Sequence, residues 1–347
     1  MAPSAFCHLT HDEAGFTPYY CRRRPGGGIV FARGKSNGNR ELNQRQTLQS
    51  DSLLLLAACI WGFAFVAQRV GMQYVGPFGF TGVRFALGCL VLLPLLLRNR
   101  ARSEGSSGRR TGWFSRPGLG GSLLAGLVLF CGASFQQVAL LYTTAGNAGF
   151  ITGLYVVLVP IIGVVLGHRT HSGTWIGTAL AAAGLYLLSA SEQFTMAPGD
   201  LMVLIGAFFW ACHVHIIGWL SPRQEPLKIA VVQNATCAVL SLMVSAAVEQ
   251  NTVIKYLSAT VPILYGGIMS VGVAYTLQVV AQMKVKPAHA AIILSLEAVF
   301  AAIGGWVFLA ETLTPRAMAG CVLMLCGMLI SQLWRVSRRD ARAADAS

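Results

Sequence analysis

One acidic side chain stands in the middle of a long apolar stretch of this sequence. Glu297 lies about ten residues into an apolar run near residues 287–309. A carboxylate at the middle of a bilayer costs at least about 3 kcal/mol unless it is paired or protonated. Glu297 could exchange a proton when a substrate or water reaches it, or it could stay protonated and join helices by hydrogen bonds. The residue type alone leaves both interpretations open.

Histidines form a second group of candidates. His213 and His289 could relay protons or bind a substrate, and each could equally be a neutral, packed histidine. His213 and His215 are two residues apart, which places them about 200° apart on a helix, so at most one of them is expected to face a cavity. Since the histidines show no i, i+4 spacing, we expect no metal site.

Further polar and aromatic side chains lie well inside apolar runs. Arg84 could hold a substrate carboxylate, pair with Glu297, or extend its charge toward the membrane surface, and Gln68 lies near the outer end of the preceding run. Amides could line a cavity or cross-link helices, and aromatic rings could pack against a substrate, a cation or the protein core. These remaining candidates are Trp61, Gln136, Asn147, Tyr155, Trp210 and Gln278.

The composition predicts which elements position these residues. The 347 residues are 54% hydrophobic and only 11% charged, which excludes a water-soluble domain because its apolar surface could not be hidden. At about 20 apolar residues for each span, residues 52–334 can hold about ten transmembrane helices. The apolar runs lie near residues 52–73, 79–97, 119–141, 148–167, 173–190, 199–220, 228–248, 260–281, 287–309 and 313–334.

Basic residues predict the direction of these helices. With both termini in the cytoplasm, 22 of the 26 Lys and Arg residues fall on the inside, and only Lys255 and Arg316 fall on the outside. We expect residues 1–51, rich in Arg, Gly, Asn and Gln, to be a disordered cytoplasmic tail, and residues 335–347 to be a second tail. The formal charge of +13 then serves topology and lipid contacts, and no nucleic-acid partner is expected.

The chain also contains a weak internal repeat. Trp61 matches Trp210 at an offset of 149 residues, and further on the offset is 142. Five helices are an odd number, so the second copy must enter the membrane from the opposite face, which gives inverted repeats over residues 52–190 and 199–334. The matches at the second offset include Gln136 with Gln278, Asn147 with His289, and Gly163 with Gly305.

Three stretches resemble a known family. They are residues 147–160 (Asn-Ala-Gly-Phe-Ile-Thr-Gly-Leu-Tyr-Val-Val-Leu-Val-Pro), residues 294–314 (Leu-Ser-Leu-Glu through Glu-Thr-Leu-Thr), and Trp-Gly-Phe-Ala-Phe-Val from Trp61. The chain is similar, over about residues 52–334, to the EamA-type branch of the drug/metabolite transporter superfamily. Members commonly have proline after the ninth-helix glutamate, whereas Ala298 here gives no reason to expect a helix break.

The resemblance implies an all-α membrane protein with ten helices in two inverted five-helix repeats. It also implies export or exchange of small metabolites across the bacterial cytoplasmic membrane. The sequence therefore predicts a secondary transporter working by alternating access, with the lipid bilayer, a small-molecule substrate and protons as its partners.

Several other functions are excluded or weakened by the sequence. A GxxxxGK[ST] stretch is absent, which excludes ATP-driven transport by this chain alone, and no cofactor is expected. A membrane-embedded enzyme would need a carboxylate pair, a Ser/His pair or a metal cluster, and no such spacing occurs. A sensor or scaffold without turnover is the main alternative. The nonpolar fifth and tenth runs are expected to be a peripheral scaffold or a homodimer surface.

Overall fold

The computed structural model describes the backbone of residues 19–23, 29–33, 37–106, 116–142, 145–168, 170, 172–189, 198–309 and 314–344. Its contacts divide the chain into two units, residues 1–49 and residues 50–347. The second unit contains all helices from α2 onward. It is also the unit that contains every residue singled out above for possible chemistry.

The N-terminal unit contains regular structure where a disordered tail was expected. β1 (Tyr19–Arg23) pairs antiparallel with β2 (Ile29–Arg33), and α1 (Asn37–Gly71) begins well before residue 52. The strands contain aromatic and β-branched residues, which favour extended structure. The first part of α1 contains Arg, Glu, Leu and Gln, which are good helix formers.

Helices make up most of the second unit. In the described part of the chain, seven helical segments are long and apolar enough to cross a membrane, and two shorter apolar segments cover Ile151–Val165 and Pro315–Ser331. The last helix continues to Ala344, so part of the expected C-terminal tail is helical. The helices after α1 are α2 (Pro77–Ser106), α3 (Arg116–Ala139), α4 (Ala145–Gly153), α5 (Tyr155–Val165), α6 (Ser172–Ser189), α7 (Pro198–Leu220), α8 (Pro226–Val248), α9 (Val253–Ser258), α10 (Thr260–Leu264), the π-helix η1 (Tyr265–Ala274), α11 (Tyr275–Ala281), α12 (Pro287–Leu294), α13 (Glu297–Leu309) and α14 (Pro315–Ala344).

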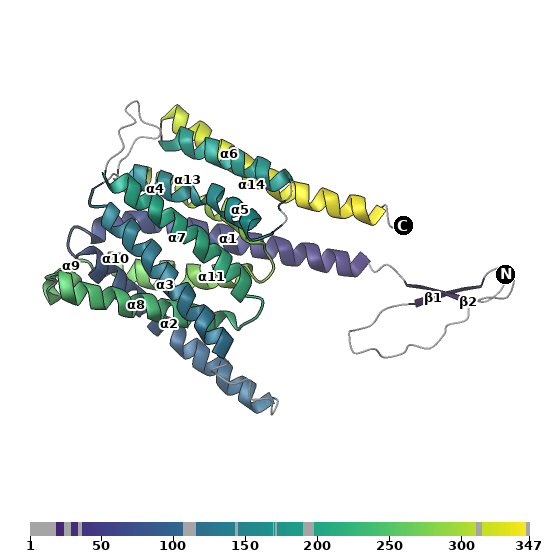
Figure 1. Ribbon diagram of the computed structural model, residues 1–347, viewed down its shortest axis with the longest axis horizontal. Helices are drawn as coiled ribbons and strands as arrows, with labels where there is room; N and C mark the ends of the chain where they lie inside the picture. Colours follow the sequence, from purple (N-terminus) through teal and green to yellow (C-terminus); the bar gives the residue numbers. More distant parts are fainter. Residues whose placement is uncertain are drawn as a thin grey trace. The chain divides into compact units, whose positions relative to one another are not determined.

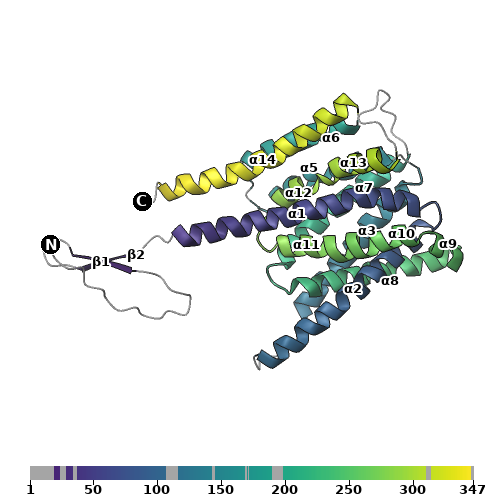
Figure 2. The same ribbon diagram turned by 180° about the vertical axis from the view of Figure 1, so that it is seen from behind.

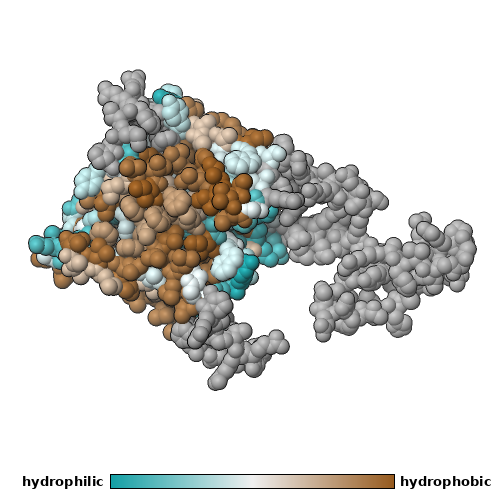
Figure 3. All heavy atoms as spheres, in the orientation of Figure 1, coloured by the Kyte–Doolittle hydropathy of each residue, from teal (hydrophilic) through white to brown (hydrophobic). Residues whose placement is uncertain are grey.

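The outer surface of the helical unit is apolar. Leu90, Val165 and Met243 are each more than 60% exposed. On the face seen in Figure 3, hydrophobic residues cover the middle of the unit and hydrophilic residues gather toward its two edges. Lipid is the solvent that stabilises such a surface, and helices satisfy their backbone hydrogen bonds within the bilayer. The second unit is therefore a multi-pass membrane domain.

The fourth and ninth apolar runs are each broken near the middle. α4 ends at Gly153 and α5 begins at Tyr155, while α12 ends at Leu294 and α13 begins at Glu297. The two breaks coincide when the chain is shifted by 142 residues. Contrary to the expectation from Ala298, the second break forms without proline, through i to i−3 backbone hydrogen bonds that tighten the turn.

These two broken runs pass through the helical unit in opposite directions. α4 packs against α13, and α5 packs against α12. Figures 1 and 2 show α4 and α13 toward one end of the bundle, and α5 and α12 toward the other. Equivalent segments of an inverted repeat must run antiparallel in this way, because they enter the membrane from opposite faces.

Helices α6 and α14 pack closely against each other through glycines. A Cβ atom placed on Gly184 would lie 2.6 Å from the carbonyl oxygen of Gly320, and one on Gly177 would lie 2.7 Å from that of Gly327. Only glycine allows two backbones to approach so closely. The glycine face of α6 is therefore covered by α14 of the same chain, and a homodimer remains a prediction.

Candidate functional site

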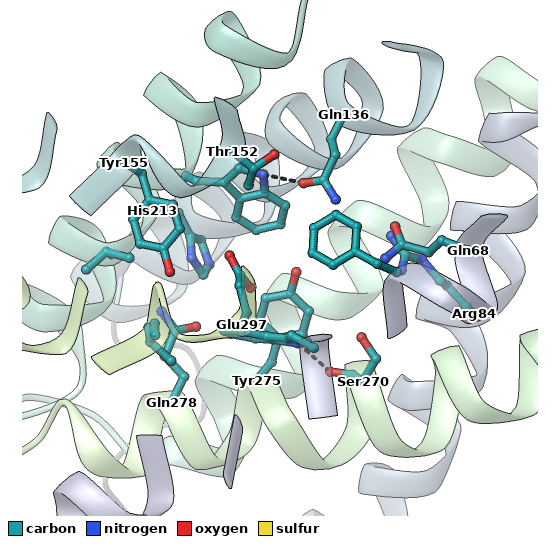
Figure 4. Close-up of a pocket in the computed structure, with 15 residues that line it drawn as sticks. Gln68, Arg84, Gln136, Thr152, Tyr155, His213, Ser270, Tyr275, Gln278 and Glu297 are labelled. Carbon is teal, nitrogen blue, oxygen red and sulfur yellow. Dashed lines mark hydrogen bonds between the residues drawn. The ribbon is translucent and has the colours of Figure 1, made fainter. Parts of the chain in front are cut away.

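A cavity lies inside the helical unit where both broken runs meet the first helix of each repeat. It encloses about 550 Å³ of empty space, including the part open to the exterior. The side chains in Figure 4 project into it from both halves of the chain. Its lining consists of Trp61, Phe65, Gln68, Arg84, Gln136, Thr152, Tyr155, Trp210, His213, Val214, Ser270, Tyr275, Gln278, Leu294 and Glu297.

Ten of these fifteen residues form pairs related by the internal repeat. A residue and its symmetry equivalent can line one small cavity only near the axis that relates the two halves, so the cavity lies at the interface of the repeats. Two pairs are separated by 149 residues and three by 142. They are Trp61 with Trp210, Phe65 with Val214, Gln136 with Gln278, Thr152 with Leu294, and Tyr155 with Glu297.

Glu297 is the first residue of α13, directly after the helix break. It is 7% exposed, and the hydroxyl of Tyr155, at the start of α5, points toward its carboxyl group across the cavity (Figure 4). Among the described residues, the structure records no ion pair between Glu297 and a basic side chain. A buried carboxyl group without a counter-charge is most stable when it holds a proton or a cationic ligand.

Aromatic rings form a large part of the cavity wall. Trp61 donates its Nε1–H to the carbonyl oxygen of Ser270 at 3.1 Å, and Trp210 donates its Nε1–H to Oε1 of Gln136 at 2.9 Å. The ring of Tyr275 lies 4.8 Å from that of Trp61 and 6.4 Å from that of Trp210, measured between centroids. These contacts fix both indole rings in place, one from each repeat, and present aromatic faces to a bound molecule.

Arg84 is a buried cation in the same wall. It is 5% exposed, and its guanidinium carbon lies 5.6 Å from the ring centre of Phe80 and 5.2 Å from that of Phe85. Within the described residues, its Nε atom has no hydrogen-bond partner, and no ion pair with Glu297 occurs. Aromatic faces stabilise the charge of a guanidinium group but do not accept hydrogen bonds from its N–H donors. Arg84 therefore remains able to bind an anionic group.

The two neighbouring histidines have different surroundings. His213 lines the cavity, and its Nε2 atom lies 3.0 Å from Oε1 of Gln233. His215 is not among the lining residues, and its Nε2 atom donates to the carbonyl oxygen of Val159 at 2.7 Å. This separation follows from their positions on opposite faces of α7.

One candidate from the sequence lies away from the cavity, and the side chain of another falls outside the described residues. His289 lies away from the cavity, with Nε2 located 3.2 Å from Oδ1 of Asp51 and Nδ1 located 3.0 Å from Oγ of Ser331. These partners are distant in sequence, so spacing along the chain could not reveal them. The side chain of Asn147 lies outside the described residues.

Sequence reasoning missed six lining residues. Phe65 and Val214, and Thr152 and Leu294, could have been found by applying the two repeat offsets to every apolar position near a candidate. Ser270 and Tyr275 lie in η1 and directly after it. No residue pattern marks the wider winding of a π-helix, so their orientation was not accessible from the sequence.

Comparisons with known proteins agree with this architecture. The EamA-like transporter family model matches the chain twice, over residues 48–190 and 197–332. An uncharacterized transporter of Archaeoglobus fulgidus is 34% identical over 304 residues, covering 86% of this chain and 90% of the relative. A Salmonella typhimurium protein named a "probable amino-acid metabolite efflux pump" is 26% identical and covers 84% of this chain and 97% of the relative. A crystal structure at 19% identity shares the fold, with a TM-score of 0.67 over 84% of this chain and 99% of that chain.

An apolar multi-pass domain with an internal cavity that both repeats line with polar and aromatic side chains defines a membrane protein of the transporter class. The two matches to the family model account for both repeats, and the archaeal relative extends over most of the chain. The chain belongs to the EamA-like transporter family.

Proposed function

We propose that this protein is a secondary transporter that moves a small organic metabolite across the cytoplasmic membrane by alternating access, as an exporter or exchanger. The central observation in favour of this function is the cavity, which both repeats line with equivalent residues and which contains buried, unpartnered polar groups. If the repeats exchange conformations, the same cavity opens to the opposite face of the membrane.

The proposed topology has ten transmembrane helices with both termini in the cytoplasm. The excess of Lys and Arg on the inside supports this direction. The antiparallel course of the two broken runs supports the inversion of the repeats. A cytoplasmic-membrane location agrees with an Escherichia coli relative that is named an inner membrane transporter.

Glu297 is the proposed coupling group. Its buried carboxyl group holds a proton when the cavity is empty and releases it when a cationic group of the substrate takes the place of that proton. Only one of the two occupies the carboxylate at a time, so each transport cycle exchanges substrate for proton. The position of Tyr155 supports this role, because its hydroxyl points into the cavity toward this carboxyl group.

The proposed substrate carries both a carboxylate and an ammonium group. Arg84 offers a cation without an acidic partner among the described residues, and Glu297 offers a carboxyl group without a basic one. The rings of Trp61, Trp210 and Tyr275 suit an apolar or aromatic side chain. The name of the Salmonella relative, a probable amino-acid metabolite efflux pump, agrees with a substrate of this class.

A thermal-stability screen of the detergent-purified protein tests this assignment. Each amino acid is compared with the amine that lacks its carboxylate and with the acid that lacks its ammonium group. Ligand at 100 times its Kd adds about 2.7 kcal/mol to the free energy of unfolding. We expect zwitterions to raise the melting temperature of the protein. The amine without the carboxylate and the acid without the ammonium group should leave it unchanged. Stabilisation by neutral sugars or nucleosides alone would contradict the proposed substrate.

A further inference from the structure

The start of α2 is fastened to the end of α8 by one carboxylate. Glu249 follows α8 directly, and its Oε1 and Oε2 atoms accept hydrogen bonds from the backbone N–H groups of Phe78 and Gly79, each at 2.8 Å. These two residues belong to the first turn of α2, where backbone N–H groups have no partner within the helix. A carboxylate is a strong acceptor at this place, because it also interacts favourably with the positive end of the helix dipole. The end of α8 therefore caps the start of α2.

Further hydrogen bonds hold Glu249 in this position. The hydroxyl of Ser245 and the side-chain amide of Asn251 each donate to its Oε2 atom at 2.8 Å. Asn251 also accepts a hydrogen bond from the backbone N–H of Gly76 at 3.1 Å. A Cβ atom on Gly76 would lie 2.5 Å from Cδ of Glu249, so the missing side chain at Gly76 lets the carboxylate reach the start of α2.

Arg84 lies on the same helix, five residues after Gly79, and therefore about 8 Å farther along the helix axis. Its guanidinium group is flanked by aromatic rings and, among the described residues, forms no ion pair with a carboxylate. α2 also packs against α8 and η1, but nonpolar contacts with these helices are non-directional. The hydrogen bonds to Glu249 are directional, with distances of about 2.7 to 3.2 Å and near-linear angles. The cap therefore fixes the position of α2, and of Arg84, along the helix axis.

In the described part of the chain, the equivalent helix of the second repeat has no such cap. At the offset of 149 residues, α8 corresponds to α2, and Gln233 corresponds to Arg84. Glu225, at the N-cap position of α8, makes no side-chain hydrogen bond to the start of that helix. The end of α2 contributes only Asn99, whose Nδ2 atom lies 3.5 Å from Oε1 of the exposed Glu225. The capped helix is thus the one that brings a cation into the cavity wall, and the uncapped helix carries a neutral amide at the same place.

We propose that Glu249 is a positioning residue for substrate recognition: its cap on α2 fixes where the guanidinium group of Arg84 lies in the cavity. A donor must come within about 3.2 Å of a substrate carboxylate, so a small shift of α2 along its axis moves the donors of Arg84 out of range. Glu249 is not among the residues that line the cavity, so it acts through α2. This inference rests on the recognition of a substrate carboxylate by Arg84 that is proposed above.

A double-mutant cycle of Glu249→Gln with Arg84→Gln tests the positioning role. The NH2 group of glutamine cannot accept a hydrogen bond from a backbone N–H, so one of the two bonds to α2 is lost. We expect calorimetry to show about fivefold weaker binding of a zwitterionic amino acid and unchanged binding of the amine that lacks its carboxylate. In the Arg84→Gln background, Glu249→Gln should have no further effect, because the group that it positions is gone.

Two further variants complete the cycle. Glu225→Gln changes the carboxyl group at the other end of the α2–α8 pair and should leave both affinities unchanged. Ser245→Ala removes one hydrogen bond to Glu249 and should weaken zwitterion binding by about twofold, which keeps the test valid if Glu249→Gln fails to fold. Unchanged zwitterion binding in Glu249→Gln, equal weakening of both ligands, or a full effect on top of Arg84→Gln would overturn the positioning role.

Hydrogen–deuterium exchange of the full chain without ligand separates this inference from the proposed function. We expect exchange at residues 78–85 to accelerate by about tenfold in Glu249→Gln, while exchange at residues 227–234, the equivalent part of α8, stays unchanged. If this acceleration occurs but zwitterions do not bind the wild-type protein, only the proposed substrate is contradicted. Unchanged exchange at residues 78–85, or equal acceleration in both segments, would show that the cap does not fix α2 and would overturn the inference.

Discussion

The central cavity and the α6–α14 pair are built on opposite principles. In the cavity wall, Arg84, Gln68, Thr152 and Gln278 each have a buried polar atom without a hydrogen-bond partner among the described residues. Between α6 and α14, glycines let the two backbones approach closely. The cavity wall contains polar atoms without hydrogen-bond partners, whereas the α6–α14 pair is closely packed through glycines.

This difference indicates that the cavity serves ligand binding, whereas the α6–α14 pair serves the stability of the fold. Unpartnered buried groups cost stability, and a ligand that enters the cavity can complete those that line it. Close glycine packing contributes dispersion contacts and a fixed geometry but offers nothing to a ligand. Changes in the cavity should therefore alter binding and transport at nearly constant stability, and changes between α6 and α14 should do the reverse.

The largest effect on transport is expected from Glu297→Gln. Glutamine keeps the shape of the side chain but neither gains nor loses a proton, so substrate exchange in proteoliposomes should fall by at least about a hundredfold. The melting temperature should stay near that of the wild type. Glu225→Gln, an exposed carboxyl group at the start of α8, is the matched control and should leave transport unchanged.

The largest effect on stability is expected from Gly184→Leu. The new side chain would begin 2.6 Å from the carbonyl oxygen of Gly320, and such overpacking costs about 1 to 3 kcal/mol or more. We expect a lower melting temperature, while the Kd of the surviving folded protein for its ligand stays constant. Gly120→Ala, where no atom lies within 4 Å of the new Cβ, should not lower stability, and equal losses in both variants would contradict the packing argument.

Arg84→Gln should affect affinity more moderately. Loss of a charged hydrogen-bond donor to a substrate carboxylate should weaken binding by about tenfold to a hundredfold. A ligand without that carboxylate should bind wild type and variant equally. Calorimetry with such a ligand pair provides the measurement, and equal weakening for both ligands would show that Arg84 acts only on the shape of the cavity.

The smallest effect is expected from Trp210→Phe. Phenylalanine keeps an aromatic face but cannot donate to Oε1 of Gln136, which Trp210 now does at 2.9 Å. Loss of one neutral hydrogen bond is worth about 1 kcal/mol, so affinity should fall by about fivefold. Trp61→Phe, at the equivalent position, loses the bond to Ser270 and should behave alike if the repeats contribute equally. A large difference between the two variants would show that one repeat dominates binding.

The membrane class of this fold was readable from the sequence because apolar runs and basic loops are local signals. The offsets of the repeat were also readable, and they relate Trp61 to Trp210 and Gln136 to Gln278, all of which line the cavity. The helix break before Glu297 was not predicted, because it arises from backbone hydrogen bonding without proline. The regular structure before residue 52 was missed because its polar composition resembles that of disordered chains.

The site was harder to predict from the sequence where contacts join segments that are distant along the chain. His289 was a cavity candidate, but Asp51, which is 238 residues away, holds it elsewhere. The orientation of Ser270 and Tyr275 depends on a π-helix. Glu297 could be identified by its cost in a bilayer, but its position beside Tyr155 in the cavity became evident only when the structure brought the two breaks together.

The most direct test of the coupling at Glu297 is the number of protons released when the purified protein binds its ligand. The ligand is added to the protein in weakly buffered detergent solution, and a pH indicator and a calorimeter record proton release and binding together. We predict release of about one proton for each bound zwitterion in the wild type, and none in Glu297→Gln. Ligand binding without proton release, at every pH at which the wild-type protein stays folded, would contradict exchange of substrate and proton at this carboxyl group.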